Sequence, residues 1–590
     1  MNREKRLLLP ALVILLLAAS MAAAAEPYQV TVERGVEVQM RDGVTLRADI
    51  YRPNADGRFP VLLQRTPYDK RGSFEFGLRA AARGFVAIVQ DVRGRYASDG
   101  EWYVFKNEPN DGYDTVEWAA ALPYSNGKVG MWGGSYVGAT QVLAAIAHPP
   151  HLAGICPIVT ASNYHENWTY QGGAFEQWFD ENWTSGLAQD TFNRKMRADT
   201  NAREGMWKLP LADYPLFNFA ASDDQSAAVL APYFLDWLAH PSYDDYWKQI
   251  SIEEHYSDIN VPALHVAAWY DLFLGGSLRN YMGIKAHGGE AARGEQRLLV
   301  VIGGHSGSGR KIGAVDFGPA AAEYSADDIT LDWYDYLLRG VKNEFAGSKP
   351  VRIFVMGANT WRDEDEWPLA RARSTKYFLH SGGKANSMGG DGRLSPSAPA
   401  TEPMDQYVYD PANPVQTIGG PLCCDSQHLA PGPRDQRPVE ARDDVLIYST
   451  PPLAQDMEVT GPVALELYAK SSAVDTDFTA KLVDVDPDGF ARNLTEGILR
   501  CRYRDSRETA SLMNPGEIYK LSIDLWATSN VFLKGHVLRL EVSSSNFPRF
   551  DRNLNSGEDI KSGHRFVTAT NGILHDAQHP SALILPVVGP

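Results

Sequence analysis

Cysteine is scarce in this chain, with four residues in 590. Four are too few for a disulfide-stapled fold, and no two have the CxxC spacing of a metal site. Cys423 and Cys424 are adjacent, and adjacent cysteines rarely bond to each other because their Cα atoms lie closer than most disulfides allow. A disulfide between Cys424 and Cys501 would suit an oxidising compartment, but the sequence does not decide the pairing. Cys156, in the apolar run LAGICPIV, is expected to be a buried strand residue.

Basic residues are outnumbered by acidic ones, 56 to 73, and the formal net charge is −17. Such a chain should repel nucleic acid and anionic membranes, so neither is expected as a partner. It is not a disordered acidic chain, because 44% of its residues are hydrophobic and 11% are aromatic. It has no metal-binding motif and no phosphate-binding loop, so we expect no metal ion and no cofactor. The oligomeric state does not follow from the sequence.

A long apolar run occurs only near the N-terminus. Residues 7–19 are mostly apolar, follow the basic segment MNREKR and precede Ala23-Ala24-Ala25, which fits the small-residue cleavage rule. The run is shorter than the ~20 residues that a membrane-spanning helix needs. We therefore predict a signal peptide over residues 1–25. The mature protein is then secreted or periplasmic, begins near Glu26 and makes no membrane contact after cleavage.

The remaining chain divides by pattern into an α/β part, an insertion and a β-rich part. Residues 26–160 and 255–346 contain continuous apolar runs such as GFVAIVQDVRG and RLLVVIGGH between helical stretches, which is typical of a parallel sheet covered by helices. The helix ITLDWYDYLLRG, ending at Gly340, is expected to be the last element of this part. Residues 347–590 hold short segments such as VRIFVMG and HVLRLEVSSS separated by turns, which predicts an antiparallel β-sandwich.

The insertion, residues 161–254, lacks the α/β rhythm and is predicted to be a helical cap. It holds six of the fourteen tryptophans, and most of them are expected to be packing anchors. These are Trp168, Trp178, Trp183, Trp207, Trp237 and Trp247.

One serine lies where a buried strand turns directly into a small-residue helix. In KVGMWGGSYVGATQVLAAIAHP, Ser135 follows Gly133-Gly134 and precedes a helical pattern that starts near Gly138. Glycines remove the Cβ clashes of such a tight turn, and the helix N-terminus leaves free N–H donors beside the serine. This is the logic of a nucleophile elbow, although the usual G-x-S-x-G pattern has its second glycine one residue earlier. An ordinary βα turn with a capping serine remains the alternative from this motif alone.

A nucleophilic serine needs a base, and the base needs an orienting acid. In an α/β-hydrolase these follow in the order Ser, Asp or Glu, His, each just past a strand. Asp271 ends the run PALHVAAWY, and His305 follows LLVVIGG. His305 alone among the fourteen histidines both follows a buried-type strand directly and comes after that aspartate at a plausible distance, so Ser135, Asp271 and His305 form the predicted catalytic triad.

The oxyanion of acyl transfer needs two donors. One is the backbone N–H of Tyr136, the residue after the nucleophile. The second normally comes from the loop after the third strand, here RTPYDK, where Tyr68 offers a phenolic O–H. Its position alone favours an ordinary packed aromatic over a donor.

Six separated motifs resemble the cocaine esterase family in order: RTPYDK, DVRGRYASDG, GKVGMWGGSYVG, HVAAWYD, GGH and SSSNFPRFDRN. That family is related to the α-amino-acid ester hydrolases and shares its catalytic and sandwich domains with S15-type Xaa-Pro dipeptidyl-peptidases. The resemblance runs from about residue 30 to the C-terminus. It implies an α/β-hydrolase domain, a helical cap and a C-terminal jelly roll. It also implies the same triad, with the Tyr68 hydroxyl and the Tyr136 amide as the oxyanion hole.

The expected function is therefore a serine hydrolase that cleaves small-molecule carboxylic esters, or amides, through an acyl-enzyme. The α-amino-ester hydrolases carry acidic residues just after the catalytic aspartate, whereas here Leu272, Phe273 and Leu274 follow it. We predict an apolar acyl pocket formed by Phe273, Leu272 and Trp168. Glu166 could still supply an acid for a free α-ammonium group.

Two other functions stay open. One is Xaa-Pro dipeptidyl-peptidase or α-amino-acid ester hydrolase activity. The other is an inactive, hydrolase-like protein whose jelly roll binds carbohydrate.

Overall fold

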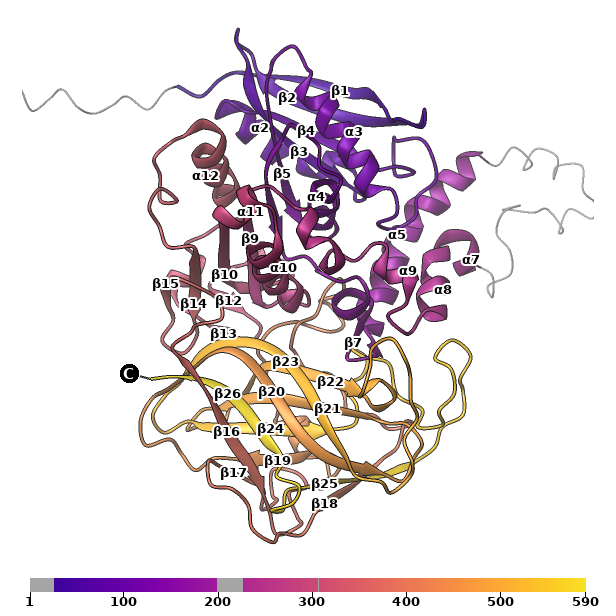
Figure 1. Ribbon diagram of the computed structural model, residues 1–590, viewed down its shortest axis with the longest axis vertical. Helices are drawn as coiled ribbons and strands as arrows, with labels where there is room; N and C mark the ends of the chain where they lie inside the picture. Colours follow the sequence, from indigo (N-terminus) through magenta and orange to yellow (C-terminus); the bar gives the residue numbers. More distant parts are fainter. Residues whose placement is uncertain (1–25, 199–225, 306, 590) are drawn as a thin grey trace, which may run out of the picture.

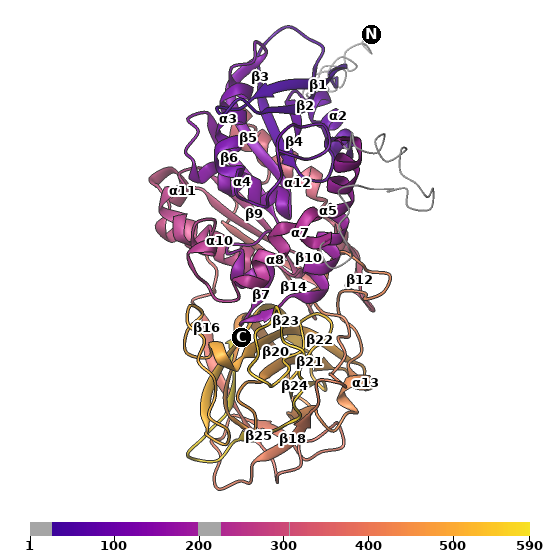
Figure 2. The same cartoon turned by 90° about the vertical axis from the view of Figure 1, so that its right-hand side faces the viewer.

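The computed structural model describes residues 26–198, 226–305 and 307–589. Two lobes lie along its long axis, the α/β part at one end and the β-sandwich at the other, with the cap helices beside their junction (Figures 1 and 2). The predicted signal peptide and Trp207 lie outside the described residues. Within the described part of the chain, no helix combines the length and the apolar character that crossing a membrane requires.

The first lobe is built on an eleven-stranded sheet. The seven central strands, β4, β3, β5, β6, β9, β10 and β14, pair in parallel. The antiparallel strands β1, β2 and β15 lie toward the two edges of the sheet. β11 (Gly307–Ser308) turns back onto β10. In spatial order the other strands are β1 (Val30–Gln39), β2 (Thr45–Pro53), β4 (Val86–Asp91), β3 (Phe59–Thr66), β5 (Ser125–Gly134), β6 (Leu152–Ile158), β9 (Ala263–Tyr270), β10 (Gln296–Gly304), β14 (Val351–Val355) and β15 (Thr360–Glu364).

Helices cover both faces of this sheet, which explains why its central strands are apolar throughout. One face packs against α3 (Glu108–Ala120), α4 (Tyr136–Ile146) and α10 (Leu274–His287), with the short α11 (Glu290–Gly294) beside α10. The other face packs against α2 (Phe74–Ala82) and α12 (Ala326–Arg339). The α12 helix begins at Ser325, whose side chain accepts a hydrogen bond from the Asp328 N–H, and ends at Gly340 in the left-handed conformation.

The cap is helical, as the sequence predicted. A two-strand ribbon, β7 (Tyr170–Gln171) and β8 (Ala174–Phe175), leads into α5 (Gln177–Ala198), and α7 (Ser226–Leu230), α8 (Pro232–Ala239) and α9 (Asp245–Lys248) follow. Of the five tryptophans that the structure describes here, Trp168, Trp183, Trp237 and Trp247 are buried. They act as the packing anchors that their composition indicated.

The second lobe is a β-sandwich of the jelly-roll kind, whose strands pair into an eleven-stranded network. A small ribbon, β12 (Lys311–Ile312) with β13 (Val315–Asp316), and the short α13 (Arg437–Glu440) lie outside it. The sandwich strands are β16 (Ala372–His380), β17 (Arg393–Ser395), β18 (Asp405–Tyr409), β19 (Leu446–Ser449), β20 (Met457–Ser471), β21 (Asp477–Val485), β22 (Ala491–Arg500), β23 (Tyr519–Phe532), β24 (Val537–Ser543), β25 (Ala569–Leu574) and β26 (Ala582–Val588).

One strand that its pattern assigned to the sandwich belongs to the first sheet instead. VRIFVMG forms β14, which pairs in parallel with β10 and extends the first sheet, and β15 then closes its edge. The helix α12 is therefore not the last element of the α/β part. A five-residue apolar strand reads the same in either sheet, because only its pairing partner distinguishes the two.

The cysteines also differ from the expectation. Cys423 is bonded to its neighbour Cys424, and Cys501 is a free, buried thiol. The pairing that the sequence left open is thus Cys423 with Cys424, and not Cys424 with Cys501. Cys156 is buried in β6, as expected.

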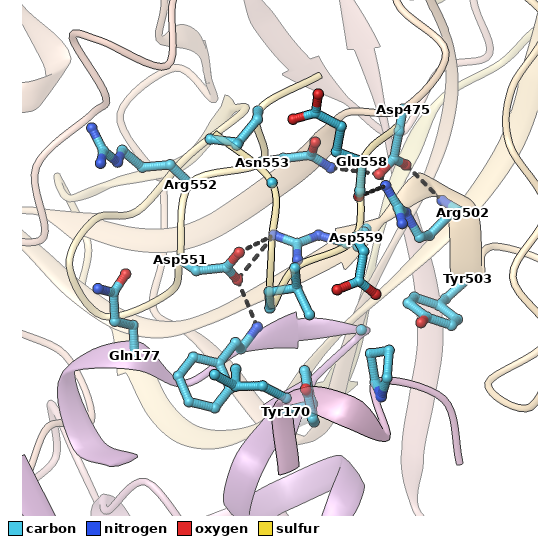
Figure 3. A pocket seen from close by; sticks show the side chains of 18 of the residues that line it. Tyr170, Gln177, Asp475, Arg502, Tyr503, Asp551, Arg552, Asn553, Glu558 and Asp559 are labelled. Carbon is cyan, nitrogen blue, oxygen red and sulfur yellow. Dashed lines mark hydrogen bonds and ion pairs between the residues drawn. The ribbon is translucent and has the colours of Figure 1, made fainter. Parts of the chain in front are cut away.

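The cap and the sandwich meet around a cavity of about 300 Å³ lined by charged side chains (Figure 3). These side chains bind one another: Arg502 Nε donates to Asp475 over 2.7 Å, and Arg500 pairs with Asp551 over 2.9 Å. Deeper in the same interface, the buried Arg549 donates to Glu176 of the cap and Glu496 of the sandwich. Breaking such a buried set is costly, so these contacts fix the cap against the sandwich.

Candidate active site

Ser135 occupies a sharp turn between β5 and α4. Its backbone lies at φ 61°, ψ −129°, a conformation that non-glycine residues rarely adopt. Its N–H donates to Ile158 O over 2.9 Å, and its carbonyl accepts from Thr160 Oγ1 over 2.8 Å. Through these two hydrogen bonds, β6 and the residues that follow it hold the turn in place.

Two glycines make room for this turn. A Cβ on Gly133 would lie 2.3 Å from Val137 Cγ1, and a Cβ on Gly138 would lie 2.8 Å from Thr160 Cβ. The late second glycine is thus explained, because at Gly138 the helix lies too close to Thr160 to leave room for a Cβ. Val137 takes the usual glycine position and is accommodated by Gly133 instead.

A buried polar chain supports the residue after the nucleophile. The Tyr136 hydroxyl donates to Glu108 Oε1 over 2.9 Å and accepts from the Phe105 N–H over 2.8 Å. Glu108 in turn pairs with Arg65 over 2.6 Å. Burial raises the pKa of the Glu108 carboxyl against the opposing effect of Arg65. The chain fixes the start of α4 and with it the Tyr136 N–H.

Ser135, His305 and Asp271 lie in one hydrogen-bonded line. His305 Nε2 is 2.9 Å from Ser135 Oγ, and His305 Nδ1 is 2.7 Å from Asp271 Oδ2. Asp271 is completely buried, and its other oxygen accepts from the Phe273 N–H over 2.7 Å. Asp271 and His305 meet because β9 and β10 are parallel neighbours, with Tyr270 opposite Gly304. The sequence-predicted triad residues therefore come together in the arrangement of a serine hydrolase.

Tyr68 and the Tyr136 N–H converge beside the nucleophile. The Tyr68 hydroxyl lies within hydrogen-bonding reach of both Ser135 and the Tyr136 backbone N–H. Although 38% of the residue's surface is exposed, burial of its hydroxyl group raises the pKa of Tyr68, against the effect of hydrogen bonding with Trp183 and Ser135. The phenol therefore keeps its proton at neutral pH and can donate it.

Two models of the S15 X-Pro dipeptidyl-peptidase family match the chain. The family's catalytic model matches residues 42–307, and the model of its C-terminal non-catalytic domain matches residues 343–584. Over 584 residues the chain is 39% identical to cocaine esterase of Rhodococcus sp. (strain MB1 Bresler), covering 95% of this chain and 99% of that protein. This chain belongs to the cocaine esterase family of α/β-hydrolases. It is a serine hydrolase of the esterase type.

Solved structures share the whole fold of this cocaine esterase family member. An aminopeptidase of the marine sediment archaeon Thaumarchaeota archaeon superposes with a TM-score of 0.81 at 24% identity, covering 95% of this chain and 97% of that chain. An α-amino acid ester hydrolase superposes with a TM-score of 0.80 at 24% identity, covering 97% and 98%. These likenesses confirm the three-part architecture.

Two of the predicted pocket residues stack on one another beside His305, and one of them contacts its ring. The Phe273 ring meets the His305 ring edge to face at 5.2 Å, and Trp168 stacks on Phe273 at 4.5 Å. Phe179 of α5 packs on the same ring at 5.4 Å. Leu272 is buried in the same hydrophobic cluster.

Glu166 lies elsewhere. Its Oε1 accepts from the Gly172 N–H over 3.0 Å, and it lines a second cavity between cap and sandwich, beside Arg504 and Arg507. That cavity includes none of the triad residues. Among the described residues, the one His and Asp/Glu group spaced to hold a metal ion is Asp484, Asp486 and His536, in the sandwich.

Sequence reasoning missed two residues that shape this site. Trp183 Nε1 donates to the Tyr68 hydroxyl over 2.9 Å, although its sequence pattern indicated only packing. Arg95, fully buried, donates from Nε to Pro67 O over 3.1 Å and from a terminal nitrogen to Leu187 O over 3.0 Å. It thus joins the Tyr68 loop to α5. The only signal in the sequence was an arginine in the motif DVRGRYASDG, and the motif does not indicate which residues that side chain binds.

Proposed function

We propose that this enzyme hydrolyses carboxylic esters with aromatic or aliphatic acyl groups through an acyl-enzyme on Ser135. The observation that carries the proposal is a contact between two features of the site. The Ser135–His305–Asp271 line supplies acyl-transfer chemistry, and the Phe273 ring, which contacts His305, begins an aromatic wall beside it.

The first half-reaction follows from the geometry. Ser135 Oγ attacks the ester carbonyl carbon while its proton passes to His305 Nε2, and the carbonyl oxygen becomes an oxyanion. Asp271 accepts from the Nδ1–H and stabilises the imidazolium. The Tyr68 O–H and the Tyr136 N–H donate to the oxyanion. As the tetrahedral intermediate collapses, the alkoxide leaves with the proton held by His305.

The second half-reaction repeats these steps with water. His305 Nε2 takes a proton from water, whose oxygen attacks the acyl carbon of the Ser135 ester. The same two donors stabilise the second oxyanion. His305 then returns its proton to Ser135 Oγ as the carboxylic acid product leaves, so the enzyme ends in its starting state.

The acyl group is expected to be apolar. Phe273, Trp168 and Phe179 are fully or nearly fully buried and present aromatic faces and edges to one another. Bringing an α-ammonium group against them without a partner costs several kcal/mol. Glu166, the acid that the sequence offered for such a group, binds the Gly172 N–H instead. This arrangement favours benzoyl or phenylacetyl groups over free α-amino acyl groups.

The test compares kcat/KM for phenylacetyl and benzoyl esters with that for phenylglycine methyl ester. An N-terminally free Xaa-Pro chromogenic amide is compared with its blocked form in parallel. We expect the esters without an amine to win by tenfold or more. If the free-amine substrates win by that margin, the amino-ester hydrolase or dipeptidyl-peptidase activity replaces this proposal. Absence of hydrolysis of every ester would instead favour an inactive, carbohydrate-binding protein.

We also propose that the protein is exported and processed near Glu26. The support is the basic, apolar and small-residue order of residues 1–25. N-terminal sequencing of protein from the periplasm or medium of an expressing bacterium should find a chain starting near Glu26. Full-length protein retained with the cytoplasm would contradict export.

A further inference from the structure

The disulfide between Cys423 and Cys424 lies in a loop of the sandwich that the catalytic mechanism does not use. Cys423 is 7% exposed, whereas Cys424 lies at the surface. A bond between neighbours closes a small ring through both side chains and the peptide between them, so it fixes the shape of the loop at this point.

The loop is held at its base by tight backbone contacts. Gly420 and Gly432 exchange two backbone hydrogen bonds of 2.8 and 2.9 Å. A Cβ on Gly432 would lie 2.8 Å from the backbone nitrogen of Gly313, and Pro433 O accepts from the Ala314 N–H over 2.9 Å. One side of the loop base is thus fixed to the segment that follows His305.

The other side of the base reaches toward the cap. A Cβ on Gly420 would lie 3.0 Å from Glu496 Oε1, and Glu496 pairs with the buried Arg549. Arg549 also binds Glu176, the residue immediately before α5. The base of the loop is therefore tied to the segment around Gly313 on one side and, through Glu496 and Arg549, to the residue before α5 on the other.

Cys423 itself joins the hydrophobic cluster of the catalytic domain and cap. That cluster contains Trp168, Phe179 and Phe273. Among the described residues, Cys423 is the cluster's one buried member from the sandwich lobe, and Ile560 packs against the cluster while partly buried. Apolar, polarisable sulfur packs well against aromatic rings.

We propose that the Cys423–Cys424 disulfide forms the sandwich side of the acyl pocket and determines which acyl groups enter. The inference rests on the aromatic acyl pocket of the proposed function. Its consequence is redox dependence. A dithiol or phosphine reductant supplies two electrons, the S–S bond breaks, two protons are taken up, and two thiols remain. The freed side chains rotate independently, which changes the shape of the wall at Cys423.

The experiment measures kcat/KM for p-nitrophenyl acetate and p-nitrophenyl benzoate on the oxidised protein and after native-state reduction with dithiothreitol. Reduction should change the benzoate-to-acetate ratio by about tenfold, the scale of one gained or lost apolar contact in a pocket. Alkylation with iodoacetamide and mass spectrometry should label the exposed Cys424 only after reduction, whereas the buried Cys156 and Cys501 should stay unlabelled. The Cys423→Ala/Cys424→Ala variant should have an altered ratio that dithiothreitol does not change. Cys501→Ala should respond like the wild type.

Four outcomes would overturn the proposal: labelling of Cys424 before reduction, an unchanged ratio after confirmed reduction, a wild-type ratio in the double variant, or an altered ratio in that variant that still responds to dithiothreitol. If the double variant does not fold, judged by circular dichroism, the reduction experiment on the wild type decides alone. Failure of the proposed function has a different signature, since the oxidised wild type would then hydrolyse neither ester. Hydrolysis of both esters with a redox-independent ratio defeats only the present inference.

Discussion

Trp183 of the cap donates a hydrogen bond from Nε1 to the hydroxyl oxygen of Tyr68, over 2.9 Å. An indole N–H can only donate, so it occupies a lone pair of the phenol and leaves the phenolic proton free for another acceptor. One candidate is Ser135, which lies within hydrogen-bonding reach of the same hydroxyl. The cap thus directs the Tyr68 proton toward the position where the oxyanion forms, which makes Trp183 a positioning residue.

Replacing Tyr68 by Phe tests the donor itself. We expect kcat to fall by about 10²–10³-fold with little change in substrate affinity, because one oxyanion donor is lost and the ring is kept. Steady-state kinetics with a chromogenic ester measure both parameters. A nearly neutral effect would mean that Tyr68 only packs.

Replacing Trp183 by Phe tests the orientation of that donor. We expect a fall in kcat of about tenfold, the value of one ordinary hydrogen bond, with KM nearly unchanged. The double variant Tyr68→Phe/Trp183→Phe should be no slower than Tyr68→Phe alone, because Trp183 acts through the phenol. Additive losses in the double variant would show that Trp183 acts by packing instead.

Replacing glycine by alanine should change the stability of the protein in opposite directions at two positions, one in α4 behind Ser135 and one in α5. Gly138→Ala should destabilise the protein by about 1–3 kcal/mol, because its Cβ would lie 2.8 Å from Thr160 Cβ. The matched control is Gly186→Ala on the exposed face of α5, where nothing lies within 4 Å of the new methyl. That change should stabilise by about 0.5–1 kcal/mol. Denaturant unfolding measures both, and equal effects would contradict the packing described at Gly138.

Asp180 on α5 predicts a pH-dependent stability. It is fully buried, neither of its oxygens has a hydrogen-bond partner among the described residues, and burial raises the pKa of its carboxyl well above 3.8, with nearby Glu176 adding to the shift. The folded state therefore holds a proton that the unfolded state releases above about pH 4, so stability falls as pH rises through that range.

Asp180→Asn removes this linkage. The variant should melt at a higher temperature than the wild type at pH 7, by about 1 °C for each kcal/mol gained in a chain of this length, and the advantage should shrink toward pH 4. Asp56→Asn, on the exposed loop between β2 and β3, is the control and should show no such trend. A constant difference between Asp180→Asn and wild type from pH 4 to 8 would show that Asp180 is not held neutral.

The sequence predicted the α/β-hydrolase fold, the helical cap and the catalytic triad because each leaves a local trace. Buried strands are continuous apolar runs, and the residues that follow them lie at one edge of a parallel sheet. Asp271 and His305 could therefore be paired from the order of two strands alone.

Contacts between distant segments left no such trace. The membership of β14 in the first sheet depends on its pairing with β10, and the Trp183–Tyr68 hydrogen bond depends on how α5 lies across the site. The bond between Cys423 and Cys424 went against a general expectation, and only the loop conformation reveals it. Tyr68 was assigned by resemblance rather than by position, and the geometry now gives it a physical reason.

The central claim is that Ser135 is the nucleophile and His305 its base. The most direct measurement is intact-protein and peptide mass spectrometry after exposure to a fluorophosphonate, with ester hydrolysis followed in parallel. We expect one adduct, on Ser135, whose formation abolishes hydrolysis. Ser135→Ala should neither label nor turn over, with kcat lowered by about 10⁴–10⁶-fold, and His305→Ala should label far more slowly. An adduct on another residue, or more than a few per cent of wild-type activity in pure, folded Ser135→Ala, would contradict the account.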